Sequence, residues 1–371
     1  MGPPKRSPAV EYRHIDRAVA RHGRNQQMPH PPRSTVTLRD VAAAAGVSVA
    51  TASRVLGGSS RTVAPEYAER VLAAASALRY TVDASARAMR RASDAITLVA
   101  DDLTTPSMGM VVAAMERQAR KSGAFVTVSS TRGTPDKQLQ TVRLLRGLRP
   151  RALVLTSGRL QSNALEEQLF RELQAYEREG GRVVIVGVAD EAFDSIDLDN
   201  HGAGYSVGNY IANSGHRKVV IFGGSHGSAN FSARVSGFID GLTSAEAEKP
   251  LIQVVSCEGN RQGGFDAARA LVERGLEGTD AVLAINDMVA IGAMSAFRAA
   301  GVKVPDDVSV TGIDDIQLAV DVTPQLTTVA LPLADVGTMS IRLALATRTQ
   351  PTNFTARGNL VIRDSTMPRS R

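Results

Sequence analysis

Three polar side chains stand where a parallel α/β fold usually binds its ligand. Arg234, Asn286 and Asp314 each lie at the end of an apolar run of strand length or just after one, and the carboxyl ends of parallel strands line the ligand cleft in such folds. Arginine offers a planar fork of donors and aspartate accepts, so the pair can clamp adjacent hydroxyl groups. The alternative is an Arg234–Asp314 ion pair that binds no ligand.

The sequence offers little for catalysis or for metal binding. Cys257 is the single cysteine, so neither an internal disulfide nor a cysteine cluster for zinc can form. There is no nucleophile elbow, no metal-ligand cluster and no dinucleotide-type spacing of glycines. We therefore expect a protein that is not an enzyme, with no catalytic residue, no metal and no cofactor.

The cysteine count and the termini bear on location. A lone cysteine fits a reducing cytoplasm, the basic N-terminus has no apolar segment of a secretory signal, and no run of 18 apolar residues could span a membrane. We expect a cytoplasmic, nucleoid-associated protein without a membrane partner.

Strand-length apolar runs alternate with amphipathic helical patterns from residue 95 onward. This alternation predicts parallel sheets covered by helices on both faces. Two such series predict two doubly wound lobes with a ligand cleft between them. The expected strands are 95–100, 125–129, 152–156, 183–188, 219–223, 252–256, 281–285 and 309–313, and the expected helices are 107–122, 135–147, 164–179, 202–214, 229–244, 262–274 and 287–300.

The positive charge of the chain is concentrated at its beginning. Residues 1–92 contain 15 basic and 6 acidic side chains, whereas the remaining residues contain 28 and 31. A basic head on a near-neutral body is typical of a nucleic-acid-binding protein, although a basic tail without a partner would give the same count. Residues 1–35 show no hydrophobic period and are predicted to be a disordered arm; whether translation begins at Met1 or Met28 stays open.

Residues 37–80 have the pattern of a helix-turn-helix. Thr37 and Asp40 have the spacing of a capping box, a first helix ends at Gly46, and Ser48 can cap a second helix over Val49 to Leu56. A third helix is predicted to begin near Pro65. Two short helices joined at a tight glycine turn are common, so the pattern alone is weak evidence for DNA binding.

The full string Thr37-Leu-Arg-Asp-Val-Ala-Ala-Ala-Ala-Gly-Val-Ser-Val-Ala-Thr-Ala-Ser-Arg-Val-Leu56 is far more specific. It resembles the headpiece of the LacI/GalR family of bacterial regulators, and the resemblance continues to about Ser365. It implies a small all-α helix-turn-helix headpiece joined to an α/β, two-lobed, periplasmic-binding-protein-like domain with two doubly wound parallel sheets. It further implies a sequence-specific repressor that binds a near-palindromic DNA operator as a homodimer.

The resemblance assigns roles to residues of the headpiece. Val49, Ala50 and Arg54 match positions that face base edges in the major groove, and Arg54 can make a bidentate contact to guanine. The positions that contact phosphates in the family are here Thr37, Ser48, Thr51 and Ser53.

The segment Ala84–Arg91 resembles the hinge helix of the family. Two such helices pair in the minor groove of the operator, where an apolar side chain opens a base step. This implies DNA contacts for Ala86 and Met89, with Met89 where the family usually has leucine. An eight-residue helix is marginal in isolation, so we expect it to order on DNA.

The resemblance also implies a sensing site for a sugar or a related metabolite. Its residues here would be Thr105, Pro106, Asn230, Arg234, Asn286 and Asp314. Several neighbouring positions depart from the family. Ser107 and Met108 stand where two aromatic residues are common, Arg261 replaces a stacking aromatic residue, and Leu331 replaces a glutamine. The nature of the ligand, and whether sensing is retained, therefore stay open.

The predicted domains are the arm 1–35, the headpiece 36–80, the hinge 81–93 and the two-lobed domain 94–365. We expect the first lobe to comprise about 94–190 and 331–355, and the second about 191–330 and 356–365. No heptad tail follows, which favours a dimer over a tetramer. Rival interpretations are a transporter's solute-binding protein, an α/β enzyme, and a regulator that answers to a protein corepressor.

Overall fold

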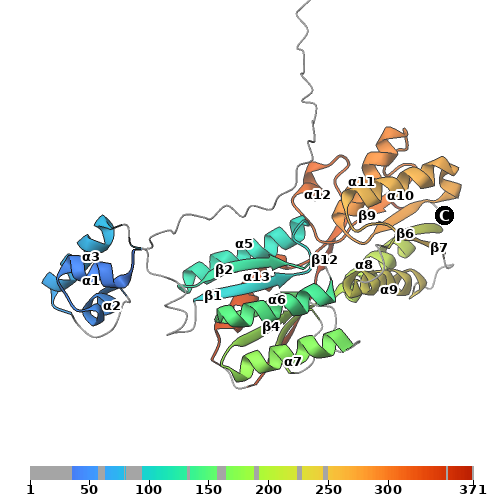
Figure 1. Ribbon diagram of the computed structural model, residues 1–371. Helices are drawn as coiled ribbons and strands as arrows, with labels where there is room; N and C mark the ends of the chain where they lie inside the picture. Colours follow the sequence, from blue (N-terminus) through green and yellow to red (C-terminus); the bar gives the residue numbers. More distant parts are fainter. Residues whose placement is uncertain are drawn as a thin grey trace, which may run out of the picture. The chain divides into compact units, whose positions relative to one another are not determined.

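The computed structural model describes residues 36–56, 63–78, 80, 94–131, 134–156, 164–187, 192–223, 228–244, 250–347 and 350–369. The chain divides into two compact units, Met1–Val82 and Asp83–Arg371. Many of the elements of both units are labelled in Figure 1.

The first unit contains three described helices, α1 (Leu38–Ala45), α2 (Val49–Leu56) and α3 (Pro65–Ala77). Their shared core is small and consists mainly of alanine and valine. Val41 and Val71 are fully buried in it, together with Ala52. Alanines let the three short helices approach closely, so this headpiece needs few large side chains to form a core.

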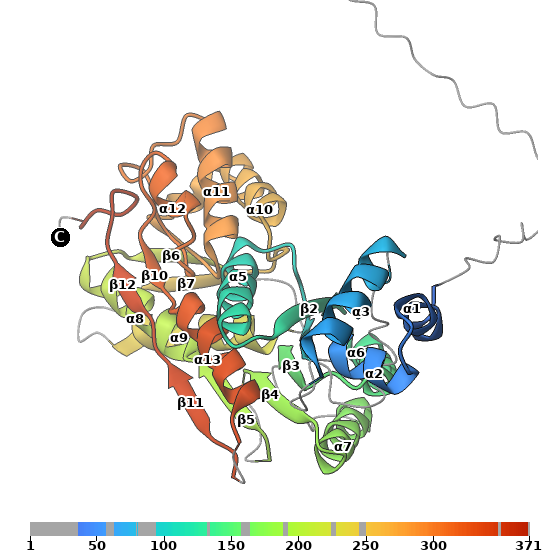
Figure 2. The ribbon, with the colours of Figure 1, turned by 90° about the vertical axis from the view of Figure 1, so that its left-hand side faces the viewer.

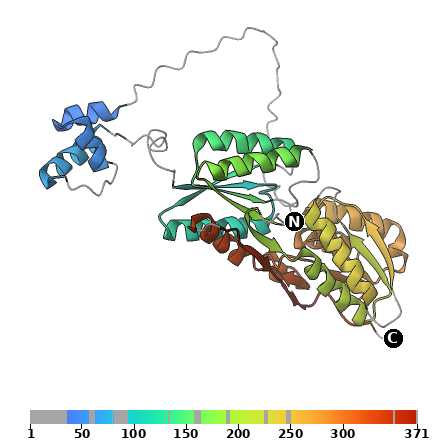
Figure 3. The ribbon, with the colours of Figure 1, turned by 90° about the horizontal axis from the view of Figure 1, so that it is seen from below.

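The first lobe of the second unit is a six-stranded parallel sheet. Helices cover both of its faces, with α5 and α13 on one side and α6 and α7 on the other (Figure 3). The strand order is β11 (Asn353–Ala356), β5 (Asp194–Leu198), β4 (Arg182–Val186), β3 (Ala152–Thr156), β1 (Ala95–Ala100) and β2 (Phe125–Ser130), and the helices are α5 (Pro106–Lys121), α6 (Pro135–Leu148), α7 (Ala164–Arg178) and α13 (Leu333–Leu345).

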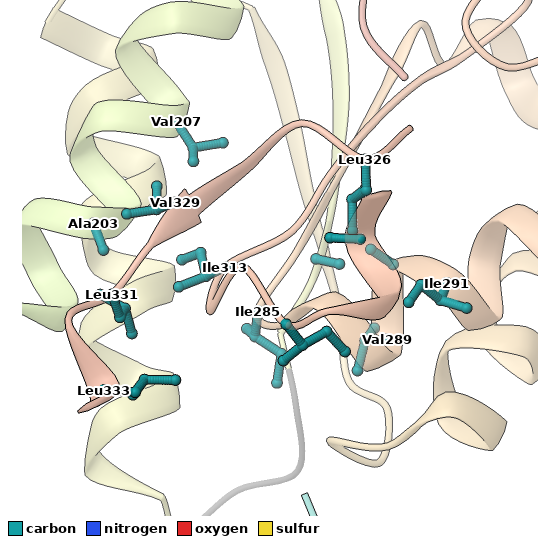
Figure 4. Packing of buried hydrophobic residues seen from close by; sticks show 14 of the residues in the cluster. Ala203, Val207, Ile285, Val289, Ile291, Ile313, Leu326, Val329, Leu331 and Leu333 are labelled. Atoms are coloured by element: carbon teal, nitrogen blue, oxygen red, sulfur yellow. The ribbon is translucent and has the colours of Figure 1, made fainter. Parts of the chain in front are cut away.

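The second lobe is a four-stranded parallel sheet with helix pairs α8–α9 and α10–α11. Its core is built from valine, isoleucine and leucine on strands and helices, part of which is drawn in Figure 4. The strand order is β7 (Leu251–Val255), β6 (Lys218–Phe222), β8 (Ala281–Ala284) and β9 (Ser309–Thr311); the helices are α8 (Asn200–Asn213), α9 (Ala229–Ser244), α10 (Arg261–Glu273), η1 (Gly275–Gly278), α11 (Asp287–Ala299) and α12 (Leu318–Asp321).

Three stretches of the described chain connect the lobes. They lead from β5 to α8, from β10 (Thr328–Ala330) to α13, and from β11 to β12 (Asn359–Val361). β10 and β12 form an antiparallel pair beside β9, and Figure 2 shows β11 and β12 following one another between the lobes. Any change in lobe separation must therefore bend these three crossovers.

The predicted two-lobed α/β architecture is confirmed, and every predicted strand and helix of the second unit is present with ends within two residues. The lobe boundary near residue 190 was wrong, because β5 belongs to the first sheet. β5 escaped prediction because its sequence, Asp-Ser-Ile-Asp-Leu, contains no apolar run. Asp194 is nevertheless buried: it binds Arg182 (Nη2–Oδ2, 2.7 Å) and accepts from the Thr352 amide (2.8 Å).

The paired helices of the second lobe touch backbone to backbone through glycines. A Cβ at Gly208 of α8 would lie 2.3 Å from the Phe238 carbonyl oxygen of α9. Equally close approaches, each within 2.0 to 2.3 Å of a carbonyl oxygen of the facing helix, occur at Gly204, Gly237, Gly241, Gly264 and Gly292. Only glycine fits at such positions, so α8–α9 and α10–α11 are interlocked pairs.

Among the described residues, no helix is both long and apolar enough to cross a membrane.

Candidate nucleic-acid interface and effector cleft

The predicted capping box at the start of α1 is confirmed. The Thr37 hydroxyl oxygen accepts from the Asp40 amide (3.4 Å), and the Asp40 carboxylate accepts from both the amide and the hydroxyl of Thr37 (2.7 Å each). The bond from the Thr37 amide is the main cause that holds the pKa of Asp40 below its usual value. The reciprocal bonds fix where α1 begins.

Gly46 makes the turn between α1 and α2. Its φ of 62° is left-handed, and its carbonyl oxygen accepts from Arg70 Nη2 on α3 (3.4 Å). The Arg70 guanidinium also lies 5.8 Å from the centre of the Tyr67 ring. Because this left-handed φ is one that residues other than glycine adopt with strain, the tight turn favours glycine; a Cβ there would also require Arg70 Nη2, 2.4 Å away, to move.

α2 presents an exposed face with one cation. The Ser48 hydroxyl accepts from the Thr51 amide (3.1 Å) and caps the helix. Ala52 is buried against the other helices, whereas Val49, Ala50 and Arg54 are exposed. A capped second helix that exposes its first turn and an arginine has the form of a helix-turn-helix recognition helix.

Of the other predicted DNA contacts, Thr51 and Ser53 are half-buried on α2. Ala86 and Met89, with the whole predicted hinge helix, lie outside the described residues.

Arg234 is the centre of the candidate effector site. It is 6% exposed, and its guanidinium donates from Nε to Asn200 Oδ1 (2.8 Å), from Nη1 to the Ile285 carbonyl (2.7 Å) and from Nη2 to Asp314 Oδ1 (2.9 Å). Of the five N–H donors of arginine, these bonds use three, and no further hydrogen bond joins Arg234 to another described residue. The ion pair considered from the sequence therefore forms, within the second lobe.

Asp314 follows β9 and is also buried. Its φ of 123° is a conformation that residues other than glycine rarely adopt. Burial raises the pKa of Asp314, while the charge and hydrogen bond of Arg234 and a hydrogen bond from the Ser107 hydroxyl oppose the shift. Since Ser107 lies in the first turn of α5, this bond joins the two lobes.

Asn286 caps α11 beside this pair. Its Oδ1 accepts from the Val289 amide (2.8 Å), and its Nδ2 donates to the Gly259 carbonyl (2.9 Å). It follows Ile285, whose carbonyl binds Arg234. The structure thus places Arg234 on α9, not at a strand end as expected from the sequence, and brings it beside Asp314 and the start of α11.

The remaining predicted effector residues lie nearer the surface. Thr105 is half-buried and caps α5 by accepting from the Met108 amide (3.4 Å), and Pro106 occupies the first turn. Pro106 directly precedes Ser107, and Thr105 lies one residue further back. Asn230 is exposed on α9 and accepts from Asn200 Nδ2 (3.3 Å). Ser107 and Asn200 therefore stand between these three residues and the Arg234–Asp314 pair.

Sequence reasoning missed two contacts of that pair. Asn200, the first residue of α8, accepts from Arg234 and donates to the Leu198 carbonyl at the end of β5 (3.0 Å). It was missed because β5 was missed; a polar pair, Asp199-Asn200, after a strand was the available signal. Ser107 was noted as a departure from the family, but its bond to Asp314 depends on how closely the lobes approach.

Two acidic residues of the cleft region were also missed. Asp101 follows β1, and burial, with the charge of Asp102 second, raises its pKa to about 6. Asp287 is fully buried at the start of α11. Within the described ranges, no group of three or more His, Cys, Asp or Glu side chains could hold a metal ion.

Two positions that depart from the family serve the fold. Arg261 donates to Ser295 Oγ on the neighbouring helix α11 (3.2 Å), and Leu331 is buried in the core at a crossover.

Family models match both units of the chain. The model for bacterial regulatory proteins of the lacI family matches residues 37–83, and that for periplasmic binding proteins and the sugar binding domain of the LacI family matches residues 93–353. The second match alone covers more than half of the chain.

Individual relatives extend over both units. The chain is 31% identical over 313 residues to the transcriptional regulator GalS of Salmonella typhimurium, which covers 84% of this chain and 89% of GalS. It is 30% identical to GalR of Escherichia coli, with 84% and 88% covered. The structure of the lac repressor dimer bound to operator and the anti-inducer ONPF is similar with a TM-score of 0.75, at 25% identity, covering 90% of this chain and 100% of that one. The chain therefore belongs to the LacI family and is a DNA-binding transcriptional regulator, not an enzyme.

Proposed function

We propose that the protein is a cytoplasmic repressor, associated with the nucleoid, that binds a near-palindromic operator as a homodimer and responds to a sugar-like effector. The observation that carries the DNA part is the exposed start of α2, where Val49, Ala50 and Arg54 project beside a helix cap. Two copies related by a two-fold axis would each read one half-site.

Within this proposal the headpiece residues divide by chemistry. Arg54 supplies base recognition through a bidentate contact to guanine, and Val49 and Ala50 offer apolar contact, for example to a thymine methyl. The hydroxyl groups of four residues would bind phosphates and so set the register of the headpiece on the DNA. They belong to Thr37, Ser48, Thr51 and Ser53. Ala86 and Met89 complete the DNA-binding set as hinge residues.

The effector site of the proposal is the cleft around Arg234. The remaining N–H groups of Arg234, the carboxylate of Asp314 and the amide of Asn286 can meet the hydroxyl groups of a sugar. Thr105, Pro106 and Asn230 would line the entrance. Support comes from the solved complex of the transcriptional regulator CelR with cellobiose, which is 26% identical to this chain with a TM-score of 0.63 and covers 89% of this chain and 99% of that one.

A homodimer is supported by exposed apolar side chains on α5, β2 and α12 of the second unit. A groove of about 500 Å³ runs between α5 and β2, lined by Val112, Ala113 and Val128 among others. The exposed large apolar residues of these elements are Met110, Phe125, Val128, Leu318 and Val320, and Leu103 lies in the loop before α5. Exposed apolar side chains on these elements, with Glu116 and Arg117 also lining the groove, favour a second copy as the partner.

The test of the proposed function is enrichment of genomic fragments by the purified full-length protein at a stated salt concentration. We expect a near-palindromic sequence. Arg54→Ala should weaken binding to that sequence by about 1–3 kcal/mol, roughly 5- to 150-fold, and leave weak, salt-sensitive binding.

Arg39→Ala is the matched control, because Arg39 is an exposed arginine of the same headpiece on α1. It should weaken binding to all sequences alike. If no sequence is enriched, or if Arg54→Ala keeps the full sequence preference, the proposal is wrong. An enriched operator whose binding ignores a panel of sugars would instead indicate a protein corepressor.

A further inference from the structure

Asp287, the first residue of α11, joins three elements of the second lobe. It is fully buried. Its Oδ1 accepts from the Thr328 hydroxyl on β10 (2.5 Å), its Oδ2 accepts from the Ile316 amide (2.9 Å), and its own amide donates to the Ile313 carbonyl (2.9 Å). One side chain thus ties a helix start, the segment after β9, and a strand that leads to a lobe crossover.

The segment held by Asp287 contains two residues in unusual conformations. Asp314 and Asp315 have φ values of 123° and 53°. Such conformations persist only where the surroundings impose them. Asp287 binds the backbone immediately before this pair, at Ile313, and immediately after it, at Ile316. It is therefore placed to impose the conformation that points Asp314 at Arg234.

The Asp287 carboxylate packs closely against the backbone at Gly312. A Cβ at Gly312 would lie 2.2 Å from Asp287 Oδ1. The glycine thus allows the carboxylate to lie directly against the backbone of the segment.

The charged groups near Asp287 are mostly engaged with one another. On the segment after β9, Asp314 is paired with Arg234 of α9 (2.9 Å) and Asp315 with Arg363 of the C-terminal segment (2.7 Å). β10 contributes the neutral hydroxyl of Thr328. Among the described residues, no cation forms an ion pair with Asp287. Burial, with the charge of Asp314 second, raises the pKa of Asp287 to about 7.

The partners of Asp287 tolerate both of its protonation states. A hydroxyl can donate or accept, so a protonated Asp287 can donate to Thr328 Oγ1 while its other oxygen still accepts from the Ile316 amide. An asparagine can make the same two bonds with Nδ2 and Oδ1, whereas alanine can make neither.

We propose that Asp287 is a positioning residue that fixes the Asp314 segment for effector binding, and that it takes up and releases a proton without losing this hydrogen-bonded frame. The inference rests on the proposed function only in assigning an effector to Asp314. It means that the charge of the cleft changes with pH while its geometry is retained.

The first experiment compares urea unfolding of the full-length wild type and Asp287→Asn from about pH 5 to about pH 9. The folded-state pKa of Asp287 is above its unfolded value, so ionisation opposes folding. Relative to Asp287→Asn, the folded-to-unfolded ratio of the wild type should fall as pH rises, by up to about tenfold per pH unit, and level off above about pH 7. If the difference in unfolding free energy between the two proteins stays constant across this range, the proposal that Asp287 takes up and releases a proton is wrong.

The second experiment measures hydrogen exchange of peptides that contain Ile316. Asp287→Ala should lose protection there, and Asp287→Asn should retain it. Asp280→Asn is the matched control, since Asp280 also accepts from two backbone amides, those of Arg217 (2.7 Å) and Lys218 (3.1 Å), elsewhere in the same lobe. Full protection in Asp287→Ala, or equal loss in Asp287→Asn and Asp287→Ala, contradicts the positioning role.

Failure of the proposed function would be seen in the operator enrichment, not in these two experiments. A wild type that enriches no operator, but gives the expected pH dependence and exchange pattern, would overturn the repressor assignment and leave the role of Asp287 in the fold intact.

Discussion

Replacing Arg234 by methionine tests whether the cleft depends on its buried ion pair. Methionine fills much of the apolar volume but removes the bonds to Asn200, the Ile285 carbonyl and Asp314. Arg234 and Asp314 have side chains only 8% and 9% exposed, so the variant leaves an aspartate buried without its cation. Breaking one partner of such a pair costs about 3–5 kcal/mol, and we expect a loss of that size in the free energy of unfolding.

A second substitution separates the charge from the packing. Asp314→Asn removes the orphaned charge, so Arg234→Met with Asp314→Asn should be more stable than Arg234→Met alone, with a coupling energy of about 1–3 kcal/mol. The loss in Arg234→Met should also be smaller in acid, where Asp314 can bind a proton.

The assay is urea unfolding of the full-length protein followed by far-ultraviolet circular dichroism. Arg269→Met is the control, because Arg269 is 60% exposed and pairs with Asp266 at the surface (3.2 Å); its loss should stay within about 1 kcal/mol. A comparable small loss in Arg234→Met, or strict additivity in the double variant, would refute the argument that the pair is buried and mutually dependent.

Three further outcomes follow from the packing and charges. Gly208→Ala should destabilise the protein by about 1–3 kcal/mol because the added Cβ meets the Phe238 carbonyl. Gly147→Ala, whose Cβ would have nothing within 4 Å, should stabilise it by a few tenths to about 1 kcal/mol. Equal effects of the two substitutions in thermal unfolding would contradict the close packing of α8 against α9. Phe125→Lys on edge strand β2 should yield a monomer in sedimentation, and Phe354→Lys on the opposite edge strand β11 should not; a dimer in both would move the interface elsewhere. Burial raises the pKa of Asp101 to about 6 in the folded protein, above its value in the unfolded chain. The wild type should therefore lose about 1–3 kcal/mol of unfolding free energy relative to Asp101→Asn as pH rises from about 4 to about 6. A difference in unfolding free energy that does not change with pH would show that Asp101 is not desolvated.

The elements that follow strong local rules could be predicted from sequence. The capping box of Thr37 and Asp40, the glycine turn at Gly46 and the apolar runs of β1 and β3 each depend on neighbours in the chain. β5 has no such signal, because its buried Asp194 is stabilised by Arg182 and by the distant Thr352 amide.

In the candidate effector site, too, some residues could be predicted from the sequence and others could not. Asn286 and Asp314 follow recognisable strand-length runs, whereas Arg234 lies on α9 and could be found only through its family string. Asn200 and Asp287 were missed because their roles come from contacts across the fold, to Arg234 in one case and to Thr328 and Ile316 in the other. The polar pair Asp199-Asn200 was the one local signal for Asn200, and nothing local distinguishes Asp287 from an ordinary helix start.

The glycine contacts of the second lobe restrict how this regulator can change shape. Along α8 and α9, carbonyl oxygens face the glycines directly, so a shift of one helix along the other would drive a side chain into a backbone oxygen. Sliding of packed helices, one of the two common modes of domain movement, is therefore blocked within these pairs. A hinge motion, in which the second lobe turns as a rigid body and the backbone near residues 198–200, 330–333 and 356–359 absorbs the rotation, would leave these helix contacts intact.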